Sequence, residues 1–164
     1  MSSLVKAKLI AQDGGDNIDF MFNPTELNFS RSMNLNAPGG ARTDDGLPKI
    51  SFGSPAPYSV TVGGLMLDTY ETGQNVVDAY IEPIRKSVEF LDGVERPPIF
   101  LLTWGKQQYI RCFVQSLSYR LTMFLSDGTP VRASVDITLQ EIGETSGSGN
   151  TGTPSRGSNR RSER

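Results

Sequence analysis

Residues 131–140 read Val131-Arg132-Ala133-Ser134-Val135-Asp136-Ile137-Thr138-Leu139-Gln140, an unbroken alternation of apolar and polar side chains. Successive side chains of a β-strand point to opposite faces of its sheet. The alternation therefore predicts a strand whose odd-numbered residues are buried and whose even-numbered residues point outward. A strand of this kind needs a partner sheet or layer to cover its apolar face, so the fold is predicted to be mainly β.

Six further segments carry strand signals, namely residues 4–12, 17–22, 27–33, 58–67, 99–104 and 109–124. The turn Asp13-Gly14-Gly15-Asp16 predicts a hairpin between the first two of these segments. A second hairpin is expected around Gly105-Lys106-Gln107-Gln108. In the segment 58–67, the pair Gly63-Gly64 permits a β-bulge or a close approach of another backbone.

One segment departs from the strand period. Between residues 74 and 91, apolar side chains recur at helical spacing: Val76, Val77, Tyr80, Ile81, Ile84, Val88 and Leu91. Pro83 lies in the middle and disfavours helix at the preceding residue, so a kink or two short helices are expected. The predicted architecture is a β-sheet closed or sandwiched on itself, with one helical crossover.

The segment 34–57 is rich in Gly and Pro and is predicted to be a long functional loop, with a possible short strand at Lys49-Ile50-Ser51-Phe52. A loop of this length inside a compact domain is usually either functional or a sign that an element has been misassigned, and the functional loop is the favoured interpretation. The apolar residues Leu35, Leu47, Ile50 and Phe52 have no purpose in a free surface loop. We expect the segment to be an assembly arm that buries these four residues against a neighbouring subunit.

Composition suggests one folded domain followed by a tail. The 164 residues carry a formal charge of −2. Residues 143–164 have no large apolar side chain and hold four Arg and two Glu, which gives +2 and leaves −4 for residues 1–142. The tail is predicted to be disordered because it cannot bury enough surface to offset its ordering entropy. We expect one folded β domain over residues 1–142 and a disordered Ser/Gly/Arg tail over 143–164.

Neither a signal peptide nor a membrane-spanning stretch is recognisable, and the body has no basic field. The expected location is the cytoplasm on synthesis, with no membrane or nucleic-acid partner. Four residues of the segment 109–124 mix basic and aromatic side chains as single-strand binders do: Arg111, Phe113, Tyr119 and Arg120. Sheet packing is the favoured explanation of these four residues, because no basic stripe continues from them.

The sequence argues against catalysis. It contains no histidine, which excludes histidine-based acid–base chemistry and histidine metal sites. The one cysteine, Cys112, has no Cys-x-x-Cys partner and is expected to be a buried small hydrophobe. Two acidic groups are explained as turns and a helix cap rather than as sites: Asp13, Asp16, Asn17 and Asp19, and Asp68 with Glu71. We therefore expect no catalytic residue, metal or cofactor.

Several short blocks of sequence nevertheless stand out along the chain. They are Phe20-Met21-Phe22-Asn23-Pro24-Thr25-Glu26, Leu65-Met66-Leu67-Asp68-Thr69-Tyr70-Glu71-Thr72-Gly73, Tyr80-Ile81-Glu82-Pro83-Ile84, Arg96-Pro97-Pro98, Trp104-Gly105 and Ser126-Asp127-Gly128-Thr129-Pro130-Val131-Arg132-Ala133. In this order they resemble one family, the contractile injection system tube proteins. Leu67 stands where the family usually has phenylalanine. The first block also has a physical reason of its own, because Pro24 fixes φ and its polar neighbours can hold a sharp corner between strands.

The resemblance implies a fold like phage tail tubes, a small β-barrel with one helix. It implies a structural subunit of a phage-tail-like particle, a hexameric ring that joins the spike or hub protein to the inner tube at the baseplate. The implied partners are further copies of the chain, the spike, the inner tube protein and other baseplate components. Relatives often continue into a LysM-like domain that grips the baseplate, and here only the Ser/Gly/Arg tail follows, which puts that role in doubt.

Two other classes of protein stay open from the residues alone. A stand-alone β-barrel could bind a ligand or an oligosaccharide, and it would then be a monomer with an occupied cavity. An enzyme that uses the acidic turns would depend on a metal or on a carboxyl group with a raised pKa.

Overall fold

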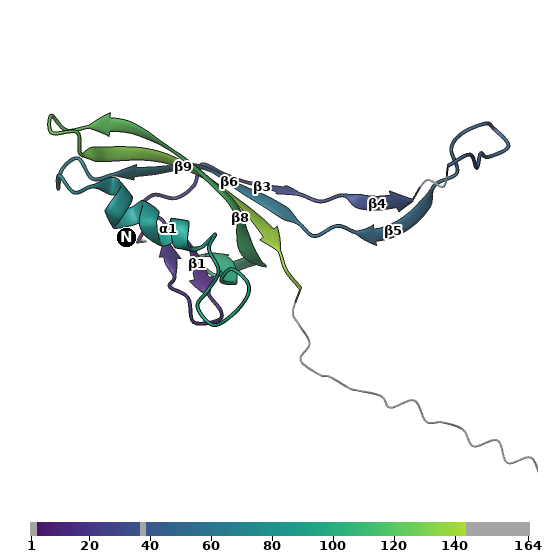
Figure 1. Ribbon diagram of the computed structural model, residues 1–164, viewed down its shortest axis with the longest axis horizontal. Helices are drawn as coiled ribbons and strands as arrows, with labels where there is room; N and C mark the ends of the chain where they lie inside the picture. The colour runs from purple at the N-terminus through teal and green to yellow at the C-terminus, as the bar shows by residue number, and fades with distance from the viewer. Residues whose placement is uncertain (1–2, 37–38, 144–164) are drawn as a thin grey trace, which may run out of the picture.

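The computed structural model describes residues 3–36 and 39–143. Its main element is a seven-stranded antiparallel sheet with the strand order β2-β1-β7-β8-β9-β6-β3, which curls into a half-barrel (Figure 1). The strands of this sheet are β1 (Ala7–Ala11), β2 (Ile18–Asp19), β3 (Glu26–Ser30), β6 (Ser59–Asp68), β7 (Phe100–Trp104), β8 (Gln107–Phe124) and β9 (Pro130–Glu141). The predicted mainly β fold with one helical crossover is confirmed. The predicted tail covers residues 143–164, and all of it after Gly143 lies outside the described residues.

The core lies on the concave face of this sheet. The inward residues predicted for the last strand are all fully buried on β9: Val131, Ala133, Val135, Ile137 and Leu139. Val60 and Val62 of β6 pair with Leu139 and Ile137 and are equally buried, so the two strands share one apolar face. The prediction of which face of β9 is buried is confirmed.

The helical crossover consists of two short helices, as Pro83 suggested. A single π-helical turn, η1 (Val77–Ile81), runs directly into α1 (Glu82–Lys86), and Pro83 lies in the first turn of α1, where its missing N–H is tolerated. Ile81 and Ile84 are buried against the sheet. The crossover therefore covers the concave face and connects β6 to β7 (Figure 1).

The predicted bulge at Gly63-Gly64 is present. The pairing of β6 with β9 shifts register between Val62 and Leu65. Gly64 has a φ of +68°, and a Cβ atom at this position would lie 2.2 Å from Oγ1 of Thr25. The glycine is required both by its backbone conformation and by the close approach of the neighbouring corner.

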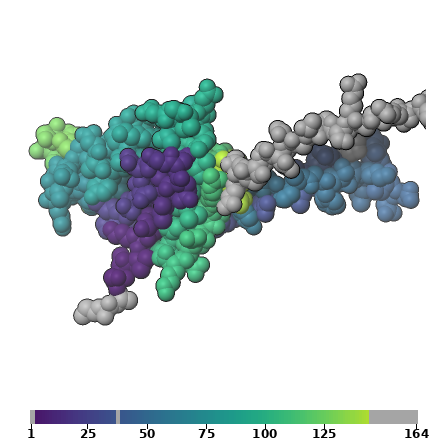
Figure 2. Space-filling view, turned by 90° about the horizontal axis from the view of Figure 1, so that it is seen from below, coloured from purple at the N-terminus to yellow at the C-terminus, as the bar shows by residue number. Residues whose placement is uncertain are grey.

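Two predictions about the middle of the chain are corrected. The segment 27–33 is not one strand, because β3 ends at Ser30 and a second strand, β4 (Met33–Asn36), begins after a break. The segment 34–57 is not an irregular loop, because β4 pairs with β5 (Ser51–Pro55) in a separate two-stranded ribbon. The backbone hydrogen bonds between the two ends of this segment give it regular structure, which its high Gly and Pro content did not suggest. The ribbon projects well beyond the body of the molecule (Figure 2).

Candidate assembly interface

Asn23 of the first block fastens the N-terminal segment to the sheet. Its Oδ1 accepts a hydrogen bond from the N–H of Ala7 at 2.8 Å, and its Nδ2 donates to the carbonyl of Val5 at 3.0 Å. Nε1 of Trp104, from the fifth block, donates to the same Val5 carbonyl at 3.2 Å. Buried Pro24 follows and fixes the corner. Two blocks far apart in sequence thus hold the segment that leads into β1. Gly105, with a φ of +64°, lies in the turn that follows Trp104.

Thr25 and Glu26 fasten the same corner to the bulge of β6. Thr25 donates its backbone N–H and its hydroxyl to the carbonyl of Gly63, at 3.2 and 3.3 Å. Glu26 begins β3 opposite Gly63. The whole of the Asn23–Glu26 corner therefore acts on backbone atoms, which is a structural role rather than a chemical one.

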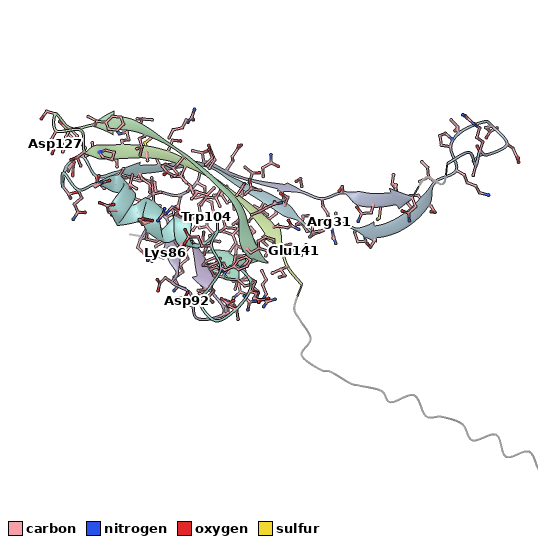
Figure 3. The ribbon with its side chains drawn as sticks, in the orientation of Figure 1. Arg31, Lys86, Asp92, Trp104, Asp127 and Glu141 are labelled. Atoms are coloured by element: carbon pink, nitrogen blue, oxygen red, sulfur yellow. The ribbon has the colours of Figure 1, made fainter. Side chains whose placement is uncertain are left out.

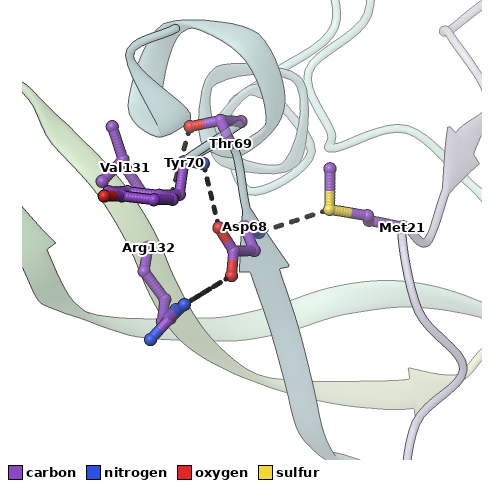
Figure 4. Close-up of polar contacts among 6 residues, drawn as sticks. All are labelled: Met21, Asp68, Thr69, Tyr70, Val131 and Arg132. Carbon is purple, nitrogen blue, oxygen red and sulfur yellow. Dashed lines mark hydrogen bonds and ion pairs between the residues drawn. The ribbon is translucent and has the colours of Figure 1, made fainter. Parts of the chain in front are cut away.

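The second block is fastened to the start of β9 (Figure 4). Oδ1 of Asp68 accepts a hydrogen bond from the N–H of Tyr70 at 2.9 Å. Oδ2 accepts a hydrogen bond from Nη2 of Arg132 at 2.7 Å. The hydroxyl of buried Thr69 donates to the carbonyl of Gln74 at 2.6 Å, while its N–H donates to the carbonyl of Val131 at 2.7 Å. The predicted turn after β6 is confirmed for Asp68. Glu71 is exposed and makes no side-chain hydrogen bond within the described residues.

Asp68 should make the stability of the fold sensitive to acid. The hydrogen bond from the N–H of Tyr70, followed by the contact with Arg132, lowers the pKa of Asp68 below its ordinary value of 3.8. A carboxyl group whose pKa is lower in the folded state stabilises the fold above its unfolded pKa, and this contribution is lost as the pH falls through the folded pKa. In thermal melts, we expect Asp68→Asn to lower Tm near neutral pH and to converge with the wild type at strongly acidic pH. The control Asp45→Asn should run parallel to the wild type throughout, and a constant offset for Asp68→Asn would contradict the ionic role.

The second block also surrounds an open pocket of about 370 Å³. Phe22 and Tyr70 stand at its rim and expose 51% and 53% of their surface. The remaining lining residues are Asp68, Thr69, Glu71, Thr72 and Arg132. Sequence blocks that are separate along the chain therefore meet at one surface. We call this surface the Phe22–Tyr70 socket.

The other block residues lie elsewhere in the fold. Arg96 forms an ion pair with Asp13, whose second oxygen accepts the N–H of Ile99 at 3.2 Å. Asp127 closes the β8–β9 turn by accepting the N–H of Thr129 at 2.9 Å, which lowers the pKa of the Asp127 carboxyl. The remaining members are Pro83 in α1, Pro97 and buried Pro98 before β7, Gly128 at φ +89° in the β8–β9 turn, and Pro130 at the start of β9. The structure does not gather these residues with the socket.

The ribbon formed by β4 and β5 has one apolar and one polar face. Leu35 pairs directly with Phe52, and Met33 pairs with Pro55, so these residues share a face. Every residue of both strands is exposed, and Phe52 exposes 79% of its surface. Ile50 lies just before β5 begins, and Leu47 lies in the tip. Of the four apolar residues predicted to form the arm's contact surface, Leu35 and Phe52 therefore share one face of the ribbon.

Polar contacts occur where the ribbon joins the body. Nε of Arg31 donates to the carbonyl of Ala56 at 2.8 Å, and its guanidinium lies 4.8 Å from the centre of the Tyr58 ring. The N–H of Tyr58 donates in turn to Oε2 of Glu141 at 2.9 Å. Figure 3 shows Arg31 and Glu141 close to the junction of ribbon and sheet. These contacts link the two segments that flank the ribbon to each other and to β9.

Within residues 3–36 and 39–143, no three His, Cys, Asp or Glu side chains are grouped as metal ligands. Burial raises the pKa of the Cys112 thiol to about 12, so this cysteine is protonated and unreactive at neutral pH. Tyr119 pairs with Val135 on the inward face of β8, and Arg120 pairs with Ser134 on the outward face, so these two do not form one surface. No helix in the described part of the chain has the length and apolar character to cross a membrane.

Sequence reasoning missed the partners of several block residues. Arg132 was visible as an outward residue of β9, but its pairing with Asp68 depends on the β6–β9 register, in which the two residues are directly opposite. Nothing in the sequence indicated the contacts of Arg31 with Ala56 and Tyr58, because the strand break beside Arg31 was not predicted. The alternation of Ile50 and Phe52 with Ser51 was the available signal for an amphipathic ribbon.

Comparison with known proteins gives one family. A family model described as contractile injection system tube protein matches residues 4–148. The match covers the half-barrel, the helical crossover and the ribbon. No curated protein matches the sequence.

Proposed function

The chain belongs to the contractile injection system tube protein family, and from this premise we propose that it is a non-catalytic ring subunit which joins the spike or hub to the inner tube at the baseplate. The proposed ring is a hexamer, and its partners are further copies of the chain, the spike, the inner tube protein and baseplate components. The candidate interface is the arm, with Leu35 and Phe52 on its apolar face, Ile50 next to β5 and Leu47 at the tip.

The observation that carries this proposal is the exposed arm. The body buries its own core, and the described residues contain no buried side-chain polar atom without a hydrogen-bond partner. The ribbon instead exposes apolar side chains on a projecting element. A two-stranded ribbon is marginally stable in water alone, and its apolar face gains stability only when another surface covers it. Association with neighbouring subunits supplies such a surface.

Replacing the tip and the apolar face of the arm tests the proposal. A variant with residues 39–49 exchanged for a short Gly-Ser link, and with Ile50→Ser and Phe52→Ser, should fold with a native-like circular dichroism spectrum. Shortening a flexible connection changes closure entropy by only about 1 kcal/mol. Native mass spectrometry and electron microscopy should show rings for the wild type and monomers for the variant.

The matched control removes two exposed apolar side chains from the body, through Val94→Ser and Phe90→Ser, which expose 40% and 70% of their surface. This control should assemble like the wild type, because its substitutions lie outside the arm. Normal assembly of the arm variant would contradict the arm's role. An unfolded arm variant would instead show that the segment contributes to the core, and a wild-type monomer with a bound ligand would indicate a binding module.

A further inference from the structure

We propose that the apolar face of the arm docks, with Phe52 as its anchor, in the Phe22–Tyr70 socket of a second copy of this chain. The inference rests on the proposed ring function and names the surface that receives the arm. The occupant of the socket is thus a neighbouring subunit rather than a small molecule.

The socket is suited to an apolar side chain. Phe22 and Tyr70 leave about half of their surfaces exposed at its rim. Two of its polar lining residues already have partners within the chain, since Asp68 binds Arg132 and the Tyr70 N–H, and Thr69 binds the carbonyl of Gln74. Glu71 is exposed to solvent and can stay hydrated beside an occupant. An apolar occupant therefore leaves none of these bonds unsatisfied. A pocket of about 370 Å³ has room for an aromatic ring.

The arm carries a complementary feature. Phe52 exposes 79% of its surface, with Leu35 directly opposite on the partner strand. Large aromatic residues that enter a pocket of the partner are typical anchors of protein interfaces. Gly53 next to Phe52 lies so close to the Asn34 carbonyl that a Cβ atom would be 2.9 Å from it, which fixes the bulge and the direction of this face.

The two features lie at opposite ends of the molecule. The arm joins the N-terminal end of β6, and the socket is built on the C-terminal end of the same strand. β6 has ten residues, so at a rise of about 3.3 Å per residue its ends are about 30 Å apart. Figure 1 shows the ribbon pointing away from the body. The arm therefore cannot fill its own socket.

An arm at one end and a socket at the other make a head-to-tail contact. Two different surfaces meet at each joint, which is a heterologous interface, and such joints generate closed rings when the rotation between copies closes. A two-fold dimer that uses the same patch on both copies is a different arrangement and gives a different result when variants are mixed.

Mixing an arm variant with a socket variant tests this directly. Phe52→Ser keeps the socket, whereas Phe22→Ser with Tyr70→Ser keeps the arm. Each alone should self-associate at least tenfold more weakly than the wild type in analytical ultracentrifugation. An equimolar mixture should form a one-to-one dimer and nothing larger, because only one productive joint is possible. Val94→Ser, mixed with either variant, serves as a control that should still form larger assemblies with itself.

Cross-linking locates the joint. Cys112 is buried and unreactive, so an introduced cysteine is the main target of a maleimide. Met33→Cys on the apolar face of β4, mixed with Thr72→Cys at the socket, should give a covalent dimer with a short bis-maleimide. Asn34→Cys, the adjacent residue on the polar face, should give several-fold less product with the same partner.

The outcomes separate this inference from the proposed function. A wild-type chain that stays monomeric at high concentration, with no product from the cysteine pair, overturns both. Wild-type rings that also form from the socket variant overturn the docking site and leave the ring function in place. A mixture that remains monomeric although both single variants fail to assemble shows that the two surfaces do not meet each other. A one-to-one dimer with preferential Met33–Thr72 cross-linking supports the inference.

Discussion

Val135→Asp is expected to remove a large part of the free energy of unfolding. Val135 is fully buried on β9, between Leu65 of β6 and Tyr119 of β8 in the two cross-strand registers. A carboxylate at this position loses its hydration and finds no cationic partner among the neighbouring core residues, which are apolar. The expected cost is about 4–5 kcal/mol or more, against a total stability of about 5–15 kcal/mol for a domain.

The matched control is the next residue. Asp136 is exposed on the opposite face of β9 and pairs with Ser118. Asp136→Ser should change the free energy of unfolding by less than about 0.5 kcal/mol, as is usual for surface positions. Urea titrations followed by circular dichroism give both values. Similar losses for the two variants would show that the assignment of the faces is wrong.

Gly64→Ala is expected to cost about 3 kcal/mol, an unusually large effect for adding one methyl group. Part of this cost is backbone strain, because a φ of +68° disfavours any residue with a Cβ atom by about 1–2 kcal/mol. The rest comes from Thr25. The new methyl group would lie 2.2 Å from Oγ1, 3.0 Å from Cγ2 and 3.2 Å from Cβ of Thr25. Rotation of the Thr25 side chain would break its hydrogen bond to the Gly63 carbonyl and would leave the contact with Cβ in place.

Gly93 separates these two contributions. It has a φ of +82°, and a Cβ atom there would meet no other atom within 4 Å. Gly93→Ala should therefore show the backbone strain alone, about 1 kcal/mol, in the same unfolding experiment. The difference between the two variants measures the contact between the bulge and the Thr25 corner. Equal costs would mean that the Thr25 corner yields easily.

The elements that could be predicted from the sequence are those in which local pattern and tertiary environment agree. The alternation in β9 predicted one buried face, which the structure has, and the Gly63-Gly64 pair predicted the position of the bulge. Pro83 divided the crossover into two helices, as its lost N–H requires. In each case the signal lies within a few neighbouring residues.

The features that were missed depend on long-range register. Met33 was assigned to the same strand as Leu27, because nothing local indicates that the chain leaves the sheet after Ser30 and pairs with Ser51–Pro55. The socket was equally hidden. Its members come from a corner, from the end of β6 and from β9, and only the β6–β9 pairing brings Arg132 opposite Asp68.

The length of β6 determines the distance between the arm and the socket. The strand carries the arm at its start and the socket at its end, so in the proposed head-to-tail assembly its length would contribute to the repeat distance from one joint to the next. Two inserted residues, with two more in each neighbouring strand, would lengthen that repeat by about 7 Å and keep every side chain on its face. A single inserted residue would turn all following side chains over. The circumference of a ring built in this way would thus depend on the number of residues in β6.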